Sequence, residues 1–283
     1  MQVANTKEQI KDIILDLRKT NISIGFVPTM GALHEGHLSL ISKALKENDV
    51  VFVSIFVNPT QFDNKKDLKN YPRTLERDVV LLKGAFKSKV FVYAPTVEDI
   101  YGKKAKSTKF EFDGLENEME GEFRDGHFNG VGTIVKRFFE IITPNKAYFG
   151  EKDFQQLQII RRLVEKNSLP VKIVGCKIHR EATGLAMSSR NERLLPEYKK
   201  EAPFIYKTLQ EAKNKFGTKS ATKITEWVKK QFEKNQLLEL EYFIIADINT
   251  LKPVKRKSKS KKYRAFVAAY AGEIRLIDNI ALN

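Results

Sequence analysis

The sequence predicts an α/β protein, in which a Rossmann-like parallel sheet covered by helices is followed by a smaller C-terminal α+β domain. Three observations predict this fold class. Apolar runs of strand length recur without polar alternation, which is typical of strands buried on both faces. Segments with helical periodicity separate these runs. After about residue 175 the order changes to helices followed by successive strands, so we expect one domain at 1–175 and another at 176–283.

The first domain begins with a predicted helix. Thr6-Lys7-Glu8-Gln9 forms a capping-box pattern, and Ile10, Ile13, Ile14 and Leu17 follow on one helical face. Apolar runs then predict strands at Ile22–Val27, Val50–Val57, Val90–Tyr93, Ala147–Phe149 and Val171–Gly175. Helical periodicity predicts helices at Leu38–Glu47, Arg73–Lys83, Gly130–Ile142 and Phe154–Lys166.

The second domain is expected to begin with an exposed loop at Lys177–Asn191. Helices follow near Pro196–Lys215 and Ser220–Lys234. Strands are predicted at Leu238–Asp247, Tyr263–Ala271 and Ile274–Asp278.

Composition limits the class of protein. The chain has 283 residues and 42% apolar residues, which allows a sizeable core. No stretch approaches the about 18 consecutive apolar residues of a membrane span, and Met1–Thr20 is typical of an amphipathic helix, not of a signal sequence. We therefore expect a soluble, cytoplasmic protein that does not contact membranes. The single cysteine, Cys176, lies in an apolar run and is expected to be structural.

The chain is strongly basic, with a formal net charge of +15. Much of the excess lies in one tract, Lys252–Arg264, between two predicted strands. A nucleic-acid surface, an anionic substrate and simple solubility would each agree with this charge. The tract has no interleaved aromatic residues that could stack on bases, so a solvated loop is the favoured interpretation.

The segment Pro28–His37 joins a predicted strand to a predicted helix that begins at His37 or just before. An open parallel sheet binds its ligand at such a place, and a helix N-terminus attracts phosphate. His34 and His37 could both face the ligand and donate hydrogen bonds to phosphate oxygens. Two histidines could instead hold a metal or complete a loop, although zinc would need a third protein ligand.

Two further segments follow predicted strands. Asn58-Pro-Thr-Gln61 is expected at the same sheet edge as Pro28–His37, where the Gln61 amide could bind hydroxyl or carboxylate groups. Gly150-Glu-Lys-Asp153 combines a glycine that permits close backbone approach with the mobile charge of Lys152. Taken alone, the first segment could equally be an ordinary loop, and a segment like the second is most often just a solvated loop.

Met187-Ser188-Ser189-Arg190 combines serine hydroxyls with a guanidinium, which suits phosphate. An exposed loop of this kind could close over a nucleotide and exclude water. In isolation, a Ser/Arg surface linker is the favoured interpretation.

The His-x-Gly-His motif at 34–37 resembles the signature of the nucleotidyltransferase superfamily. Further blocks resemble the pantothenate synthetase (pantoate–β-alanine ligase) family, in order from about Ile24 to Asn279. They are Pro28–His37, Val57–Phe62, Tyr71–Thr74, Arg124–Phe128, Phe149–Leu157, Gly184–Asn191 and Arg275–Asn279.

The resemblance implies a cytoplasmic ligase, usually a homodimer, that joins pantoate to β-alanine through an adenylate made from ATP, with Mg²⁺. Its implied catalytic residues are His34, His37, Lys152 and Arg190. The implied ATP-binding residues are Met30, Gly31, Ala32, Leu33, His34, Glu35, Gly36, His37, Gly150, Glu151, Lys152, Asp153, His179, Met187, Ser188, Ser189 and Arg190. The implied substrate-binding residues are Asn58, Gln61, Arg124 and Gln156.

Three positions depart from the family pattern. Asp125 replaces a proline beside Arg124, and His179 stands where an apolar residue is usual, so its main chain is the expected contact to adenine. Arg77 interrupts a pair of acidic residues, which leaves Asp78 as the metal candidate. Magnesium is therefore expected to arrive on ATP, held by phosphate oxygens and water.

Two rival functions remain. A nucleotidylyltransferase would join a nucleotide to a phosphorylated metabolite and release pyrophosphate without an amine. A nucleic-acid-binding protein would use the basic tract, and its affinity would fall steeply with salt.

Overall fold

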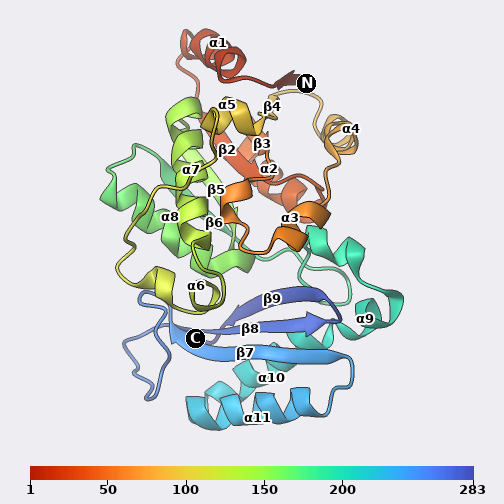
Figure 1. The fold of residues 1–283 in the computed structure, drawn as a ribbon. Helices are drawn as coiled ribbons and strands as arrows, with labels where there is room; N and C mark the ends of the chain where they lie inside the picture. The colour runs from red at the N-terminus through yellow and green to blue at the C-terminus, as the bar shows by residue number, and fades with distance from the viewer. The chain divides into compact units, whose positions relative to one another are not determined.

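The computed structural model describes all residues from Met1 to Asn283 (Figure 1). The chain forms two compact units. Unit 1 comprises Met1–Glu116, Glu120–Glu151 and Gln156–Lys177. Unit 2 comprises Asn117–Met119, Lys152–Gln155 and Ile178–Asn283. The predicted limits of two separate domains, 1–175 and 176–283, stay predictions.

A six-stranded, all-parallel sheet forms the centre of unit 1, in the order β1-β4-β3-β2-β5-β6. Its strands are β1 (Gln2–Ala4), β2 (Ile24–Thr29), β3 (Val50–Ile55), β4 (Val90–Tyr93), β5 (Lys146–Gly150) and β6 (Lys172–Cys176). The predicted fold class is confirmed. The sequence analysis missed β1, because it assigned those residues to the first helix.

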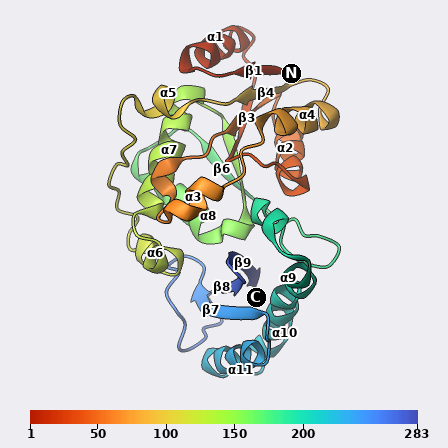
Figure 2. The same cartoon turned by 45° about the vertical axis from the view of Figure 1, so that its right-hand side comes forward.

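Helices cover both faces of this sheet (Figure 2). Val27 and its in-register neighbours point to α2 (Glu35–Glu47), where they pack with Leu38 and Ile41. Phe26, one residue earlier and on the opposite face, contacts Phe138 of α7 (His127–Ile142) edge to face. Both faces of the strands are buried, which is why the strands are continuously apolar.

The other helices of this part of the chain are mostly short. They are α1 (Lys7–Arg18), α3 (Lys65–Asn70), α4 (Leu75–Ala85), α5 (Val97–Tyr101), α6 (Glu120–Phe123) and α8 (Phe154–Lys166), with 3₁₀ turns η1 (Pro59–Gln61), η2 (Leu115–Asn117) and η3 (Glu151–Asp153). The predicted capping box is present at α1, where the Thr6 hydroxyl accepts from Gln9 N–H. The first turn of a helix needs such partners for its unpaired N–H groups.

The strand order reverses at β2. The chain passes from β2 to β3 and β4 on one side and then returns to β5 on the other side of β2. Open α/β sheets bind ligands outside the carboxyl ends of the strands at such a point. The segments after β2, β3 and β5 are therefore the places where a site is expected.

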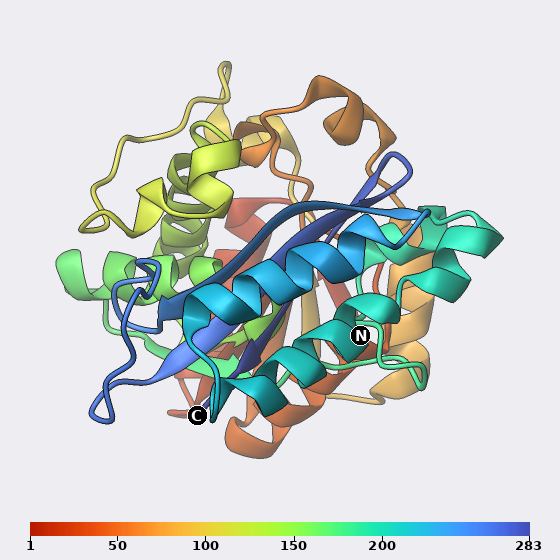
Figure 3. The ribbon, with the colours of Figure 1, turned by 90° about the horizontal axis from the view of Figure 1, so that it is seen from below.

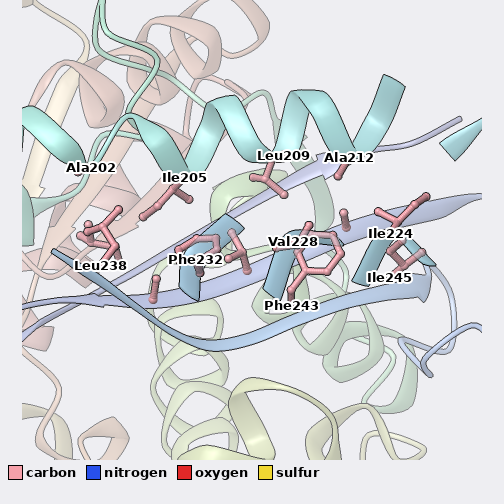
Figure 4. Close-up of a cluster of buried hydrophobic side chains, with 14 of the residues drawn as sticks. Ala202, Ile205, Leu209, Ala212, Ile224, Val228, Phe232, Leu238, Phe243 and Ile245 are labelled. Atoms are coloured by element: carbon pink, nitrogen blue, oxygen red, sulfur yellow. The ribbon is translucent and has the colours of Figure 1, made fainter. Parts of the chain in front are cut away.

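Unit 2 contains a three-stranded antiparallel sheet, β7 (Leu238–Asp247), β8 (Tyr263–Ala271) and β9 (Ile274–Ala281). Its helices are η4 (Ser189–Arg193), α9 (Pro196–Glu201), α10 (Phe204–Phe216) and α11 (Ala221–Glu233). The long helices α10 and α11 lie side by side along the sheet (Figure 3). The apolar core between these helices and the sheet contains Leu209, Val228 and Phe243 (Figure 4).

Several element boundaries differ from the predictions, two of them at prolines. Strand β2 continues through Pro28, which pairs in register with Ser54, so the strand does not end at the proline. The helix predicted at Pro196–Lys215 is two helices, because Pro203 interrupts it. A proline has no backbone N–H, so it cannot make the hydrogen bond that would continue the helix.

The composition also led to expectations about membrane spans, Cys176 and the basic tract. No helix of the chain is long and apolar enough to cross a membrane. Cys176 is a free, buried thiol at the end of β6, and burial raises its pKa. The basic tract connects β7 to β8, where a loop was predicted.

Candidate active site

The segment after β2 turns sharply before α2 begins. Gly31 and Ala32 both have positive φ, +84° and +49°. Glycine adopts this conformation without strain, and a Cβ at Gly31 would lie 3.1 Å from an Asp78 carboxylate oxygen. This turn brings the chain back over the sheet edge and begins α2 with His34 as its N-cap.

Asp78 holds this turn from beneath. Its side chain is fully buried and accepts hydrogen bonds from the N–H groups of Ala32 (3.0 Å) and Leu33 (2.8 Å) and from the Thr74 hydroxyl. The carboxylate therefore stabilises the turn, and the N–H groups of Ala32 and Leu33 already have a hydrogen-bond partner within the protein. No group of three or more His, Cys, Asp or Glu side chains is arranged to hold a metal ion. The metal role predicted for Asp78 stays a prediction that this geometry does not favour.

His34 and His37 form a close pair at the N-terminus of α2. Their ring centroids lie 4.1 Å apart. His34 Nδ1 accepts from Gly36 N–H at 3.1 Å, and His37 Nδ1 accepts from His34 N–H at 3.3 Å. A neutral imidazole that accepts at Nδ1 must carry its proton on Nε2. Both rings are thus fixed as Nε2–H donors, the form needed to bind phosphate oxygens.

The turn after β3 places Gln61 beside the segment after β2. Asn58 caps η1, and its Nδ2 donates to Gln61 Oε1 at 3.0 Å. Gln61 Nε2 then contacts Met30 Sδ at 3.2 Å. Both amides are buried, Asn58 at 1% and Gln61 at 9% exposure. As predicted, the two segments meet at one sheet edge.

Helix α7 supports this turn through close backbone contact and a buried histidine. A Cβ on Gly130 would lie 2.2 Å from the Thr60 carbonyl oxygen, so only glycine fits. His127 Nδ1 lies 2.8 Å from the Gln61 carbonyl oxygen, and its Nε2 lies 3.2 Å from Arg124. Burial first, and then the Arg124 charge, lower the pKa of His127 to about 4. The neutral ring therefore donates to Gln61 from Nδ1 and accepts from Arg124 at Nε2.

Arg124 is held by several protein groups. It forms ion pairs with Asp63 (3.3 Å) and Glu120 (3.7 Å), and it lies 3.4 Å from the Gln61 carbonyl oxygen. Its predicted contact with substrate is untested, but its contacts support the backbone that carries Gln61. Gln156, the other predicted pantoate ligand, is half-buried on α8.

The segment after β5 divides between the two units. Gly150 and Glu151 belong to unit 1, at the carboxyl end of the strand next to β2. Lys152 and Asp153 belong to unit 2 and form an ion pair of 3.5 Å. The Lys152 carbonyl accepts from Asn279 Nδ2 at 2.8 Å, which fixes this turn against β9.

In unit 2, the segment that carries Met187 and Arg190 is a small hairpin. His179 is exposed, and its carbonyl accepts from Met187 N–H at 3.0 Å. The Ser188 hydroxyl caps η4 by accepting from Arg190 N–H, and Ser189 is buried. Main-chain pairing therefore orders the predicted loop Lys177–Asn191.

A buried ion pair anchors this hairpin within unit 2. Arg180 makes a two-point contact with Asp278 of β9, at 2.6 and 2.9 Å, and stacks on Tyr206 at 3.6 Å. Burial raises the pKa of Asp278, and the Arg180 charge opposes that rise. Removing either partner would leave a buried charge uncompensated.

Within each unit, the predicted residues fall into groups. In unit 1, Met30, His34, His37, Asn58 and Gln61 lie at the carboxyl edge of β2 and β3. In unit 2, the turn Lys152–Asp153 is bonded to Asn279 of β9. The hairpin that carries Met187–Arg190 is bonded to Asp278 of β9 through Arg180. The sequence analysis assigned no role to His127 or Tyr101, whose contacts with Gln61 and Asn58 are long-range. No local sequence signal marks Tyr101.

The chain is similar to one protein family along nearly its whole length. The sequence model of the family described as pantoate-beta-alanine ligase matches residues 2–281. A pantothenate synthetase of Christiangramia forsetii is 61% identical, over 100% of both chains.

Two solved structures are also similar along the whole chain. The pantothenate synthetase of Thermus thermophilus matches with a TM-score of 0.91 and 38% identity, over 100% of this chain and 99% of that one. The pantoate-beta-alanine ligase of Francisella tularensis, in complex with beta-gamma ATP and beta-alanine, matches with a TM-score of 0.82 and 36% identity, over 100% and 98%. The chain therefore belongs to the pantoate–β-alanine ligase family.

Proposed function

We propose that this chain condenses pantoate with β-alanine to form pantothenate, at the expense of ATP. The observation that carries the proposal is the family match, which spans residues 2–281 and so includes every site segment. The Francisella tularensis relative, in complex with beta-gamma ATP and beta-alanine, supports ATP as co-substrate and β-alanine as the amine.

The reaction proceeds in two displacement steps. A pantoate carboxylate oxygen attacks the α-phosphorus of ATP, the bond from that phosphorus to the bridging β-phosphate oxygen breaks, and pyrophosphate leaves. The neutral amine of β-alanine then attacks the carbonyl carbon of pantoyl-adenylate. The bond from this carbon to the phosphate-linked oxygen breaks, AMP leaves with that oxygen, and the nitrogen loses a proton. No enzyme group becomes covalently attached.

The protein contributes positioning and electrostatic stabilisation. The Nε2–H groups of His34 and His37 donate to phosphate oxygens that gain negative charge during adenylation. The rings need no rearrangement to do so, because backbone N–H groups already fix both Nδ1 atoms as acceptors. Gln61 and Gln156 orient pantoate, with Asn58 and Arg124 supporting its site.

The remaining predicted residues act on the nucleotide in the same proposal. Lys152 and Arg190 supply cationic donors to the triphosphate, and Ser188 and Ser189 add hydroxyl groups. The rest of ATP is contacted by main-chain groups. These lie around Met30–Gly36, at Gly150, Glu151 and Asp153, and at His179 and Met187. The hairpin that carries Arg190 excludes water from the reactive adenylate.

Magnesium enters this proposal only as a companion of the nucleotide. The carboxylate of Asp78 is already bonded to two N–H groups, and no three-residue ligand cluster exists. The chain's own residues therefore do not fit a resident Mg²⁺ site, and no step is derived through the ion. A cytoplasmic location and a homodimer, both implied by the family resemblance, belong to the proposal as well.

One assay separates the proposal from the nucleotidylyltransferase alternative. AMP and pyrophosphate release is measured with ATP and pantoate, with and without β-alanine, and products are identified by mass spectrometry. The proposal expects sustained AMP release and pantothenate only when β-alanine is present. Sustained pyrophosphate release with a stable nucleotide-containing product, and no need for an amine, would instead indicate a nucleotidylyltransferase.

A further inference from the structure

We propose that Tyr101 is a positioning residue for pantoate binding: through Asn58, it reinforces which end of the Gln61 amide faces the ligand. The proposal rests on the proposed function, because it takes Gln61 as a pantoate ligand. Tyr101 lies at the C-terminal end of α5, 40 positions from Gln61 in the sequence.

The orientation of the Asn58 amide is determined by backbone groups on both sides. Its Oδ1 end faces Thr60 N–H (3.4 Å), a group that can only donate. Its Nδ2 end faces the Gly130 carbonyl (3.2 Å), a group that can only accept. A flipped amide would set donor against donor and acceptor against acceptor in a site that is 1% exposed, at a cost typical of buried unpaired groups.

Tyr101 provides the shortest contact of this group. Its hydroxyl donates to Asn58 Oδ1 at 2.6 Å and lies 3.1 Å from the Thr60 hydroxyl. The ring is itself fixed, because the Arg137 guanidinium stacks on it at 4.7 Å and also donates to the Ile100 carbonyl. Burial raises the pKa of Tyr101, so the hydroxyl keeps its proton and remains a donor at neutral pH.

The consequence for Gln61 follows from donor and acceptor matching. Asn58 Nδ2 donates to Gln61 Oε1 at 3.0 Å, so the Gln61 amide must turn its Nε2 end away from Asn58. That end contacts Met30 Sδ at 3.2 Å, and a thioether is a weak acceptor. A carboxylate or hydroxyl oxygen of pantoate is a better acceptor and replaces this contact readily. Asn58, held in this orientation by its two backbone partners and by Tyr101, thereby makes Gln61 a donor, not an acceptor, toward the substrate.

The primary test is Tyr101→Phe, which removes the hydroxyl and keeps the ring. We expect KM for pantoate to rise about threefold to tenfold, the range given by loss of one neutral hydrogen bond. KM for ATP and kcat should stay within about twofold of wild type, because the Gln61 amide is proposed to contact pantoate and not ATP.

A matched control removes another buried phenol hydroxyl. Tyr148 is fully buried and has two hydroxyl partners, Asn48 (2.7 Å) and Glu47 (3.0 Å), at the far end of α2. Tyr148→Phe should leave KM for pantoate within about twofold of wild type. An equal rise in both variants would indicate a general loss of rigidity and would overturn the inference.

A double-mutant cycle tests whether Tyr101 acts through Gln61. In a Gln61→Ala background, Tyr101→Phe should change kcat/KM for pantoate by less than about twofold, because the amide that it orients is absent. Fully additive effects would contradict the proposed connection.

Asn58→Asp serves as a second variant if Tyr101→Phe does not fold. It replaces the donor next to Gln61 by an acceptor, so Gln61 should turn and present Oε1 to the ligand. KM for pantoate should then rise by more than about tenfold while KM for ATP stays within about twofold. An unchanged KM for pantoate would overturn the inference.

The two levels of the proposal fail differently. Wild-type protein without pantoate-dependent AMP release would refute the proposed function and the inference together. Active wild-type protein whose KM for pantoate is unchanged by Tyr101→Phe would refute the inference alone.

Discussion

The turn Asn58–Gln61 and the basic loop, Lys252–Lys262, are both polar segments next to strands, but they are built differently. In the turn, Asn58 and Gln61 are buried, and both ends of the Asn58 amide meet matched partners. In the basic loop, Lys255, Arg256 and Lys259 are exposed. The loop contains much of the positive charge of the chain, but only the turn has side chains fixed in one orientation by their neighbours.

This difference shows that charge alone is a poor guide to a site. A buried polar group must be matched by its neighbours, so its orientation is fixed and its substitution is costly. An exposed lysine stays hydrated and conformationally free, so it contributes little to stability. One member of the basic loop differs: Lys257 reaches the carbonyls of Phe216 and Lys219 at the end of α10 and stacks on the Phe216 ring.

The largest expected effect concerns the histidine pair at the same sheet edge as the turn. His37→Ala should reduce turnover roughly 10²–10³-fold, because a donor to the charged phosphate oxygens is lost. The readouts are steady-state AMP release and pantoate-dependent exchange of pyrophosphate into ATP.

A matched variant separates catalysis from helix capping. His37 also accepts from His34 N–H at the N-terminus of α2, a contact that glutamine at this position can replace. His37→Gln should therefore preserve the melting temperature better than His37→Ala and still lose most of the activity. Near-normal exchange in either variant would show that the role assigned to His37 is wrong.

The second prediction concerns His127 beneath the turn. Its folded-state pKa of about 4 lies below the ordinary value of 6.5, so the unfolded state binds more protons between these values. Stability should be unaffected above about pH 6.5, fall as the pH decreases, and lose about 3 kcal/mol from this group below about pH 4.

Urea unfolding at several pH values tests this dependence in wild type and in His127→Asn. The variant lacks the titrating ring, so its stability should decline less than that of wild type between about pH 7 and pH 4.5. Parallel pH profiles would contradict the assignment of a buried neutral imidazole.

The third prediction compares two glycines of unit 1. At Gly130, an added Cβ would lie 2.2 Å from the Thr60 carbonyl oxygen and 2.6 Å from Gln61 Cα, both backbone atoms. Gly130→Ala should therefore cost about 1–3 kcal/mol of unfolding free energy and weaken pantoate binding. Gly84, in α4, has nothing within 4 Å of an added Cβ, so Gly84→Ala should stabilise by up to about 1 kcal/mol. Similar effects at both positions would mean that α7 does not pack tightly on the turn.

The smallest effects are expected in the basic loop. Changing Lys255, Arg256, Lys259 and Lys262 together to serine should leave ligase activity within about twofold and stability within about 0.5 kcal/mol. Lys257→Ala alone should cost about 1 kcal/mol, because its carbonyl partners at the end of α10 lose a cation. A large loss of activity in the fourfold variant would assign the loop a function and break the comparison.

The sequence predicted elements best where a local pattern determined them. The limits of β4, β7, β8 and α8 are those expected, since continuous apolar runs and helical periodicity are local signals. Strand β1 has only three residues, too few for a pattern to appear. The end of β2 was misjudged, because the strand was expected to stop before Pro28 although it continues to Thr29.

The residues that meet at the carboxyl ends of β2 and β3 could be named from the sequence, but their supporting contacts could not. The motif around His34 and His37 identified the pair, and the strand-end position of Gln61 identified the turn. The roles of His127 and Tyr101 arise from contacts across 66 and 43 positions of the chain, which no short motif encodes. The bond between Asp78 and the turn after β2, which competes with its predicted metal role, is equally non-local.

In the proposed reaction, the pantoate carboxylate attacks the α-phosphorus of ATP. The most direct measurement uses pantoate with ¹⁸O in its carboxylate, ATP and β-alanine, followed by mass spectrometry of the released AMP. Adenylate formation predicts one ¹⁸O atom in each AMP and none in pyrophosphate. Unlabelled AMP, or label in a released inorganic phosphate, would contradict the account.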